Sequence, residues 1–370
     1  MLWIVLYTGV FAVALVWALV LTPLAGRWGA RWGMLDAPGQ RKIHHIITPR
    51  SGGLAIYGAF AGTLLAGAAA FALLVRADAT GAALAPYRAN LAVIAPRLIA
   101  ILGGLTMAFI VGLVDDRKSL GPRVKLVGQI LAAVPLLLTG VRIDIFLQEW
   151  VPAPLAWGLG AALTVAWVVL LMNSLNFLDN MDGLTGGVAC VISLVLAGFS
   201  VLQGHIFMTA AYLALAGALL GFLRYNWAPA RLFMGDSGSL TIGYALAALT
   251  INSRFYDAEA RTGLPVLIPL IVLSVPLFDT ASVMLIRWRR GAPLMQGDTN
   301  HLSHRLVALG FTRPQAVTFI CLLTFVTAMM ALPLRHLSWI PSLLHAGALA
   351  GLFALIFIME RVAQRKIRQK

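Results

Sequence analysis

The sequence is poor in charge and in cysteine for its length. Charged residues make up only 11% of 370 residues and there are two cysteines, whereas hydrophobic residues make up 60% and the mean hydropathy is +0.87. This composition excludes a disordered, collagen-like or disulfide-stapled protein and a set of soluble domains. Cys190 and Cys321 both lie in apolar runs, where a buried structural thiol is the usual role. We therefore predict an integral membrane protein.

Three sequence features are also missing: a Gly-Lys dipeptide, a basic residue before the first apolar run, and a repeat of fixed period. Without Gly-Lys there is no Walker A loop, which excludes an ATP-driven pump of that type. The first charge is Arg27, so we expect no cleavable signal peptide and a first segment that remains as an anchor. With no long linker, residues 1–359 are predicted to form one transmembrane domain, followed by a basic tail over 360–370.

Long apolar runs bounded by charge, glycine and proline fill most of the sequence. A helix needs about 20 apolar residues to cross the hydrocarbon core of a bilayer. The runs therefore predict an all-α polytopic membrane protein with about 10–11 transmembrane helices. The expected spans are roughly 3–22, 53–75, 97–114, 122–140, 154–172, 183–203, 206–222, 237–252, 264–286, 315–333 and 340–358.

The net charge of +14 is distributed unevenly between the loops on the two sides of these spans. Three quarters of the 28 Lys and Arg residues fall in one alternating set, and the positive-inside rule makes that set cytoplasmic. The N-terminus is then outside and the C-terminus inside, and the basic excess needs no nucleic acid to explain it. Nine of the 14 acidic residues map to the same side, so we expect the active site on the cytoplasmic loops.

Two of the polar clusters on that side contain carboxylates. Asp115 and Asp116 end the third span, and because adjacent helical residues point about 100° apart they can serve two different partners. A second cluster places Asn173, Asn176, Asp179 and Asp182 at intervals of three residues, along one side of a helical or 3₁₀ segment. Such a row suits a polar ligand or a hydrated cation. The alternatives are a solvated helix end and a polar cap.

Two more clusters carry an acid and a set of cations. Asp236 precedes the eighth span, where helix amides attract anions, although an N-cap would explain it too. His301, His304 and Arg305 share a face if they begin a helix, which suits a phosphate better than zinc, since zinc needs four ligands. Asp279 lies within the ninth span, either in a buried polar pair or in a functional role.

Carboxylates, carboxamides, histidines and cations on one membrane face suit Mg²⁺ and a phosphate-bearing substrate. A transporter or lipid flippase is the alternative of another class. Transport predicts polar residues near the bilayer midplane, whereas these residues gather at one interface.

Five motifs, in order over roughly residues 30–310, resemble those of the polyprenyl-phosphate N-acetylhexosamine-1-phosphate transferases. They are Asp36 to His44 with Pro49 to Gly53, Asp115-Asp116 with Leu120 and Lys125, Asn173 to Leu184, Asn226-x-x-Pro-Ala-x-x-Phe-Met-Gly-Asp-Ser-Gly-Ser, and His301-x-x-His-Arg. The resemblance implies Mg²⁺-dependent transfer of a sugar-1-phosphate from a UDP-sugar to a polyprenyl phosphate, with release of UMP. It also implies a bacterial inner (plasma) membrane location. Mn²⁺ is an alternative ion, and a homodimer is one option for the assembly.

The resemblance also implies roles for individual residues. Asp236 and Asp116 would hold the metal, and Asp115 would orient or deprotonate the acceptor phosphate. The catalytic set is Asp115, Asp116, Asp236, His301 and Arg305. The substrate-binding set is Lys42, His44, Lys125, Asn173, Asn176, Asp179, Asp182, Asn226 and His304.

The fourth cluster bears on the sugar. The family branch that transfers phospho-N-acetylmuramoyl-pentapeptide has a His-His-His run there, whereas His301-Leu-Ser-His304-Arg305 resembles the branch that uses UDP-N-acetylglucosamine. We therefore favour N-acetylglucosamine-1-phosphate and keep the pentapeptide donor as the alternative. Asn180 departs from the family pattern, in which a glycine is common.

Overall fold

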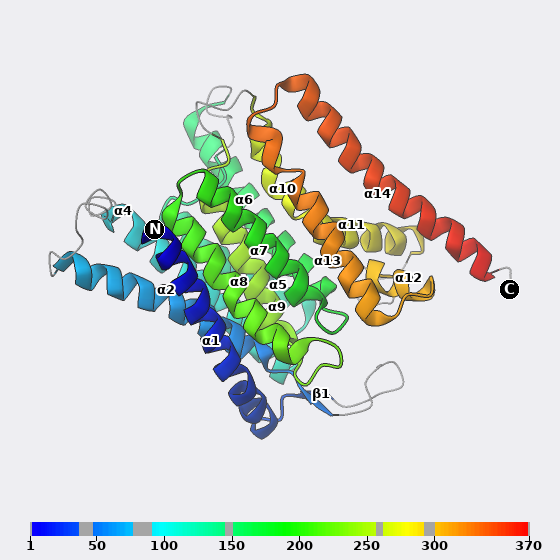
Figure 1. The fold of residues 1–370 in the computed structure, drawn as a ribbon, viewed down its shortest axis with the longest axis horizontal. Coiled ribbons are helices and arrows are strands. Elements are labelled where there is room, and N and C mark those ends of the chain that lie inside the picture. Colours follow the sequence, from blue (N-terminus) through cyan, green and yellow to red (C-terminus); the bar gives the residue numbers. More distant parts are fainter. Residues whose placement is uncertain are drawn as a thin grey trace.

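The computed structural model describes residues 2–36, 47–76, 91–144, 151–256, 262–291 and 300–368, and this part of the chain is almost wholly helical (Figure 1). Lys42 and His44 lie outside the described residues. The long helices are α1 (Leu2–Arg31), α2 (Gly52–Arg76), α4 (Leu91–Arg117), α5 (Pro122–Leu138), α6 (Ala153–Leu178), α7 (Leu184–Leu202), α8 (Ile206–Asn226), α9 (Gly235–Asn252), α11 (Ser274–Arg289), α13 (Arg313–Met329) and α14 (Trp339–Arg368). The short elements are α10 (Ile268–Val272), α12 (Leu302–Ala308), and two 3₁₀ turns at Leu264–Leu267 and Leu332–Arg335.

Every predicted span coincides with helix, which confirms an all-α polytopic membrane fold. Among the described residues, eight helices are long and apolar enough to cross a membrane, or nine if the bent pair Leu264–Val272 and Ser274–Arg289 is one span. The prediction of about 10–11 also counts α5 and α9, which fall short of the length or hydropathy that defines the eight or nine. The 17 residues of α5 extend only about 26 Å, short of the roughly 30 Å hydrocarbon core. The first turn of α9, Gly-Asp-Ser-Gly-Ser, is polar.

Two elements near the C-terminus differ in detail from the sequence-based expectation. The ninth predicted span is broken at Leu273, where its two halves meet at an angle of 72°. The last helix, α14, continues without interruption to Arg368, so most of the expected tail over 360–370 extends that helix. In Figure 1, α14 lies at the edge of the bundle, where the ring of Phe353 stacks on Phe278 of α11 at 4.6 Å.

The centre of the bundle is formed by α7, α8 and α9, with α1, α2 and α4 on one side and α10 to α13 on the other (Figure 1). From Ser237 to Thr250 every residue of α9 is buried, including the large side chain of Tyr244. A helix that is apolar on all sides needs neighbours on all sides, and α9 has them in α2, α4 and α6. The polar first turn of α9 is thereby fixed between three other helices.

A small hairpin and two glycines complete the surroundings of that turn. Strand β1 (Leu35–Asp36) pairs antiparallel with β2 (Thr48–Pro49), and the chain then donates amide hydrogen bonds from Gly52 and Gly53 to the carbonyls of Phe233 and Met234. A side chain at Gly53 would lie 2.3 Å from the backbone nitrogen of Gly238. A side chain at Gly112 of α4 would lie 2.4 Å from the carbonyl oxygen of Asp236. These close approaches bring α2 and α4 against Asp236.

Candidate active site

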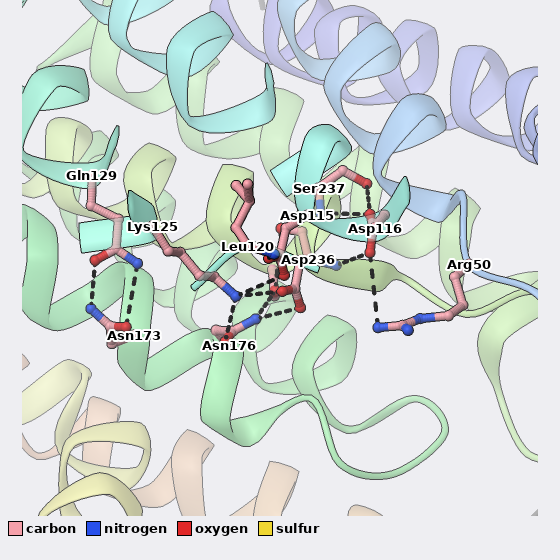
Figure 2. A network of polar contacts seen from close by, with 11 residues as sticks. Arg50, Asp115, Asp116, Leu120, Lys125, Gln129, Asn173, Asn176, Asp236 and Ser237 are labelled. Atoms are coloured by element: carbon pink, nitrogen blue, oxygen red, sulfur yellow. Dashed lines mark hydrogen bonds and ion pairs between the residues drawn. The ribbon is translucent and has the colours of Figure 1, made fainter. Parts of the chain in front are cut away.

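The ammonium group of Lys125 is surrounded by three side chains, and these and Lys125 come from four different helices (Figure 2). Lys125 of α5 lies 3.3 Å from Asp115 Oδ2 of α4 and 3.4 Å from Asn176 Oδ1 of α6, and it is also paired with Asp236 Oδ2 of α9. Asn176 in turn donates to Asp236 Oδ1 at 2.8 Å and to Ser239 Oγ at 2.9 Å. Residues that the sequence places in three separate motifs thus form one hydrogen-bonded cluster.

The two adjacent aspartates serve different partners, as their helical positions predict. Asp115 accepts the backbone N–H of Leu120 at 2.7 Å, which fixes the turn between α4 and α5. Asp116 has a fully buried side chain and accepts the amides of Asp236 at 2.7 Å and Ser237 at 2.9 Å, as well as the Ser237 hydroxyl at 2.6 Å. A carboxylate placed there caps a helix start that otherwise has unsatisfied N–H groups. Asp116 therefore holds the turn that carries Asp236, and its role as a metal ligand stays a prediction.

The row at intervals of three residues is split by the end of a helix. Because α6 ends at Leu178, only Asn173 and Asn176 lie on it, while Asp179 is at its C-cap and Asp182 lies in the following turn. Asn173 donates at 2.8 Å to Gln129 Oε1 of α5, which donates back at 3.3 Å, a reciprocal amide pair beside the Lys125 cluster (Figure 2). Gln129 is buried, and it lies outside the motifs recognised in the sequence.

Asp182 and Asn226 hold the loops beside the cluster. Asp182 Oδ2 accepts the amide of Ala230 at 3.0 Å. The carboxamide of Asn226, which is only 4% exposed, accepts the amide of Gly183 at 3.0 Å and donates to the carbonyl of Leu232 at 2.9 Å. These bonds tie the loop after α6 to the loop before α9. The direct contact of Asn226 with substrate that we expected stays a prediction.

Several acidic groups share this region, and their charges affect one another. Partial burial and the nearby charge of Asp236 raise the pKa of Asp179 to about 7, although the guanidinium of Arg50 acts in the opposite direction. Burial would also raise the pKa of Asp236, but hydrogen bonding with Asp115 and the ammonium of Lys125 hold that pKa below its usual range. Asp236 is therefore the carboxylate that stays ionised most readily, as a cation ligand must.

The fourth predicted cluster forms around a buried carboxylate. Asp279 of α11 is 1% exposed and lies 2.7 Å from Nδ1 of His301, and it accepts the amide of Leu302 at 2.6 Å. This pairing fixes the start of α12 and leaves Nε2 as the free nitrogen of the imidazole for other contacts. Arg305 donates to Ser282 Oγ of α11 at 3.0 Å. The sequence indicated an intramembrane acid at Asp279, but only the structure shows that its partner is His301.

One hydrogen bond joins the second and fourth clusters. Ser303 of α12 donates to Asn180 Oδ1 at 2.5 Å, and Asn180 donates to the carbonyl of Phe177 at 3.0 Å. The ring of Phe177 lies 6.4 Å from that of His301, and the ring of His304 lies 6.5 Å from His301. The departure from the family glycine at position 180 thus supplies a contact between the loop after α6 and α12.

The oxygen atoms around Lys125 are of the kind that a hard divalent cation prefers as ligands. Asp115, Asp236 and Asn176 each direct an oxygen at the ammonium group, so they already converge on a positive charge. Within the described ranges, no group of three or more His, Cys, Asp or Glu side chains could hold a metal alone. Mg²⁺ is commonly bound by one or two carboxylates with water and substrate phosphates completing the shell. Binding of Mg²⁺ here stays a prediction.

The sequence of the chain is similar to those of known proteins, and the similarity includes the residues of the Lys125 cluster. Residues 98–254, which include Asp115, Lys125, Asn176 and Asp236, match glycosyl transferase family 4. The chain is 31% identical to the probable undecaprenyl-phosphate N-acetylglucosaminyl 1-phosphate transferase of Bacillus subtilis, over 96% of this chain and 90% of that protein. It is 34% identical to the decaprenyl-phosphate N-acetylglucosaminephosphotransferase of Mycolicibacterium smegmatis, over 82% and 77%.

A protein named for the alternative donor is also similar. The phospho-N-acetylmuramoyl-pentapeptide-transferase of Desulforudis audaxviator is 30% identical, over 90% of this chain and 96% of that protein. The three matches cover 82–96% of this chain and 77–96% of the relatives. The resemblance to this family is therefore confirmed, and this multi-pass membrane protein belongs to glycosyl transferase family 4.

Proposed function

We propose that the protein transfers N-acetylglucosamine-1-phosphate from UDP-N-acetylglucosamine to undecaprenyl phosphate or a similar polyprenyl phosphate, releasing UMP and forming a lipid-linked sugar diphosphate. The observation that carries this proposal is the cluster of Asp115, Lys125, Asn176 and Asp236. It joins two carboxylates, a carboxamide and a cation at the ends of four helices. Phosphoryl transfer depends on positioning and on stabilising charge, and this set of groups can supply both.

Each residue of the cluster has a task in that reaction. Asp115 is fixed by the amide of Leu120 and by Lys125, so it is placed to orient or deprotonate the acceptor phosphate. Asp236 and the Asn176 carboxamide provide the oxygens for Mg²⁺, or for Mn²⁺ in its place, and Asp116 keeps Asp236 in position. A bound Mg²⁺ would neutralise charge on the donor diphosphate. A single displacement, with the acceptor phosphate attacking the β-phosphorus of the UDP-sugar, needs no covalent intermediate on the enzyme.

The donor and the orientation form part of the same proposal. His301-Leu-Ser-His304-Arg305 lacks a His-His-His run, and relatives named for N-acetylglucosamine transfer cover most of the chain. The excess of Lys and Arg on one side supports a site at the cytoplasmic face, with the N-terminus outside and the C-terminus inside. The membrane in this proposal is the bacterial inner membrane. His301 and His304, and the buried Arg305, would then face the phosphates of a donor that arrives from the cytoplasm.

The test is UMP release by the purified protein in detergent with Mg²⁺ and undecaprenyl phosphate. UDP-N-acetylglucosamine and UDP-muramoyl-pentapeptide are offered separately. We expect release with the first donor, loss of release with a chelator, and loss in Asp236→Asn, which keeps the shape of the side chain but removes its charge. Asp144→Asn is the matched control, because that carboxylate is 61% exposed and pairs only with Arg142.

The two donors separate the competing interpretations. Release with the pentapeptide donor alone would keep the reaction and change the sugar. No release with either donor from folded protein, together with flux of a lipid or ion across a sealed bilayer, would replace the transferase with a transporter.

A further inference from the structure

The cations around the carboxylate cluster differ in how many of their hydrogen-bond donors are already used. A lysine ammonium has three N–H donors, and Lys125 has three acceptors around it, on Asp115, Asn176 and Asp236. A diphosphate needs donors that are not engaged elsewhere. Lys125 therefore offsets part of the negative charge of the cluster but has few N–H donors left to offer to a substrate.

Among the described residues, Arg50 is a second cation beside the cluster, 3.9 Å from Asp116, and the backbone places it there. It follows strand β2, and its own amide donates to the carbonyl of Met34 at 2.9 Å. On either side of it, Pro49 accepts the amide of Phe233, and Gly52 donates to the carbonyl of Phe233. Because Phe233 lies three residues before Asp236, Arg50 is held in register with the turn that carries the proposed metal ligand.

The guanidinium of Arg50 lies among carboxylates without being hydrogen-bonded to them. Nη1 is 3.8 Å from Asp36 Oδ1, and Nη2 is 3.9 Å from Asp116 Oδ1, beyond the length of a hydrogen bond (Figure 2). The Arg50 side chain is 38% exposed, in contrast to the fully buried side chain of Asp116. Within the described part of the chain, the five N–H donors of this guanidinium therefore have no hydrogen-bond acceptor, and the side chain is partly exposed to water.

We propose that Arg50 binds the diphosphate of the nucleotide-sugar donor. The inference rests on the proposed function, to which it adds a substrate contact. A guanidinium matches two phosphate oxygens with two parallel hydrogen bonds, and such charge-assisted bonds are among the strongest available to a protein. A water-soluble nucleotide reaches the site from the aqueous side, where Arg50 is exposed. The acceptor phosphate is instead assigned to Asp115, and in Figure 2 Asp116 lies between Asp115 and Arg50.

A purely structural role for Arg50 makes a different prediction. A half-exposed ion pair at 3.9 Å contributes little to stability, and its loss would weaken all ligands equally or none of them. A phosphate contact instead distinguishes ligands by their phosphates. Uridine and UDP share the base and the ribose and differ only in the diphosphate, so their affinities can be compared without any turnover.

The experiment measures binding of UDP and of uridine to the full-length protein in detergent with Mg²⁺, for wild type, Arg50→Ala, Arg50→Lys and Arg313→Ala. Arg313 is an exposed arginine at the start of α13 and serves as the control for the loss of one positive charge. We expect Arg50→Ala to weaken UDP by about tenfold to a hundredfold and uridine by less than about twofold. Arg50→Lys should recover part of the loss, and Arg313→Ala should match wild type.

Kinetic constants then identify which phosphate is involved. We expect the KM for UDP-N-acetylglucosamine to rise in Arg50→Ala, with the KM for undecaprenyl phosphate unchanged. Equal weakening of UDP and uridine, unchanged UDP binding, or a rise in the undecaprenyl phosphate KM alone would each overturn the proposal. Wild-type protein that binds UDP but releases no UMP would refute the proposed function while the comparison of UDP with uridine still tests Arg50. Wild-type protein that binds no UDP would refute both.

Discussion

Gly112 tests whether the close packing of α4 on α9 sets the position of Asp236. Replacing it with alanine places a methyl group 2.4 Å from the Asp236 carbonyl oxygen and the Ser237 Cα, and 2.5 Å from the Ser237 nitrogen. All three neighbours are backbone atoms, so no flexible side chain can move aside. Ordinary van der Waals contact begins near 3.4 Å, so α4 and the first turn of α9 must separate by about 1 Å.

A displacement of that size acts more on activity than on folding. Overpacking of this kind lowers the free energy of unfolding by about 1–3 kcal/mol, and the better helix propensity of alanine offsets up to about 1 kcal/mol of that loss. The protein should therefore still fold. The displacement stretches the bonds from Asp116 to the α9 amides and moves Asp236 away from Lys125 and Asn176. Misplacing a reacting group by about 1 Å can reduce turnover by on the order of a hundredfold.

The assay compares UMP release and thermal unfolding of Gly112→Ala with those of Gly103→Ala. Gly103 lies in the same helix, but a methyl group there would come no closer than 3.8 Å to Pro135. We expect Gly103→Ala to keep wild-type turnover, and Gly112→Ala to lose on the order of a hundredfold in kcat with only a small fall in Tm. Full activity in Gly112→Ala would refute the reasoning, and so would equal losses in both variants.

Three further substitutions test other parts of the site. Asp279→Asn would present an amide to His301 Nδ1 in place of a carboxylate and would hold the imidazole less firmly in one orientation, so turnover should fall by about tenfold or more; wild-type turnover would show that the pair is only structural. Because the pKa of Asp179 is raised to about 7, the folded state holds a proton between about pH 4 and 7 that the unfolded state has lost, and stability falls as pH rises through that range. Asp179→Asn should therefore raise Tm at pH 8 without divalent cations, with a gain that shrinks toward pH 4; a gain independent of pH would contradict this. Asn226→Ala leaves the amide of Gly183 and the carbonyl of Leu232 without their partner and should lower stability by about 2–4 kcal/mol, whereas Asn252→Ala loses only a local bond to Ala248. An unchanged Tm with weaker UDP binding would instead favour direct contact between Asn226 and the nucleotide.

The sequence predicted the helices well because long apolar runs determine them almost alone. It did not reveal the 72° break at Leu273, since hydropathy is continuous through that region and carries no information on direction. It left the helix α12 as a condition for His301, His304 and Arg305 to share a face, because seven residues are too few for a periodic pattern.

The predicted site residues were largely brought together, but the partner of each one depends on tertiary packing. The angle between Asp115 and Asp116 indicated two different partners, and the structure confirms this. Nothing in the sequence showed that the second partner is the backbone of α9. The regular row from Asn173 to Asp182 suggested one face, yet the end of α6 at Leu178 directs its members to different loops. Arg50 and Asn180 were part of recognised motifs, but only the packing of the loops shows what they contact.

The arrangement of charge around Asp236 explains why so many residue types are needed within one small volume. Asp116 uses its charge on the amides of α9, and Lys125 uses its donors on Asp115, Asn176 and Asp236. These groups therefore satisfy one another in the absence of substrate. In the proposed reaction, a donor diphosphate would add negative charge to a set that already holds more carboxylates than cations, so its binding would call for a divalent cation and a positively charged side chain with unused donors. The oxygens of Asp236 and Asn176 can bind the first, and the guanidinium of Arg50 meets the second requirement.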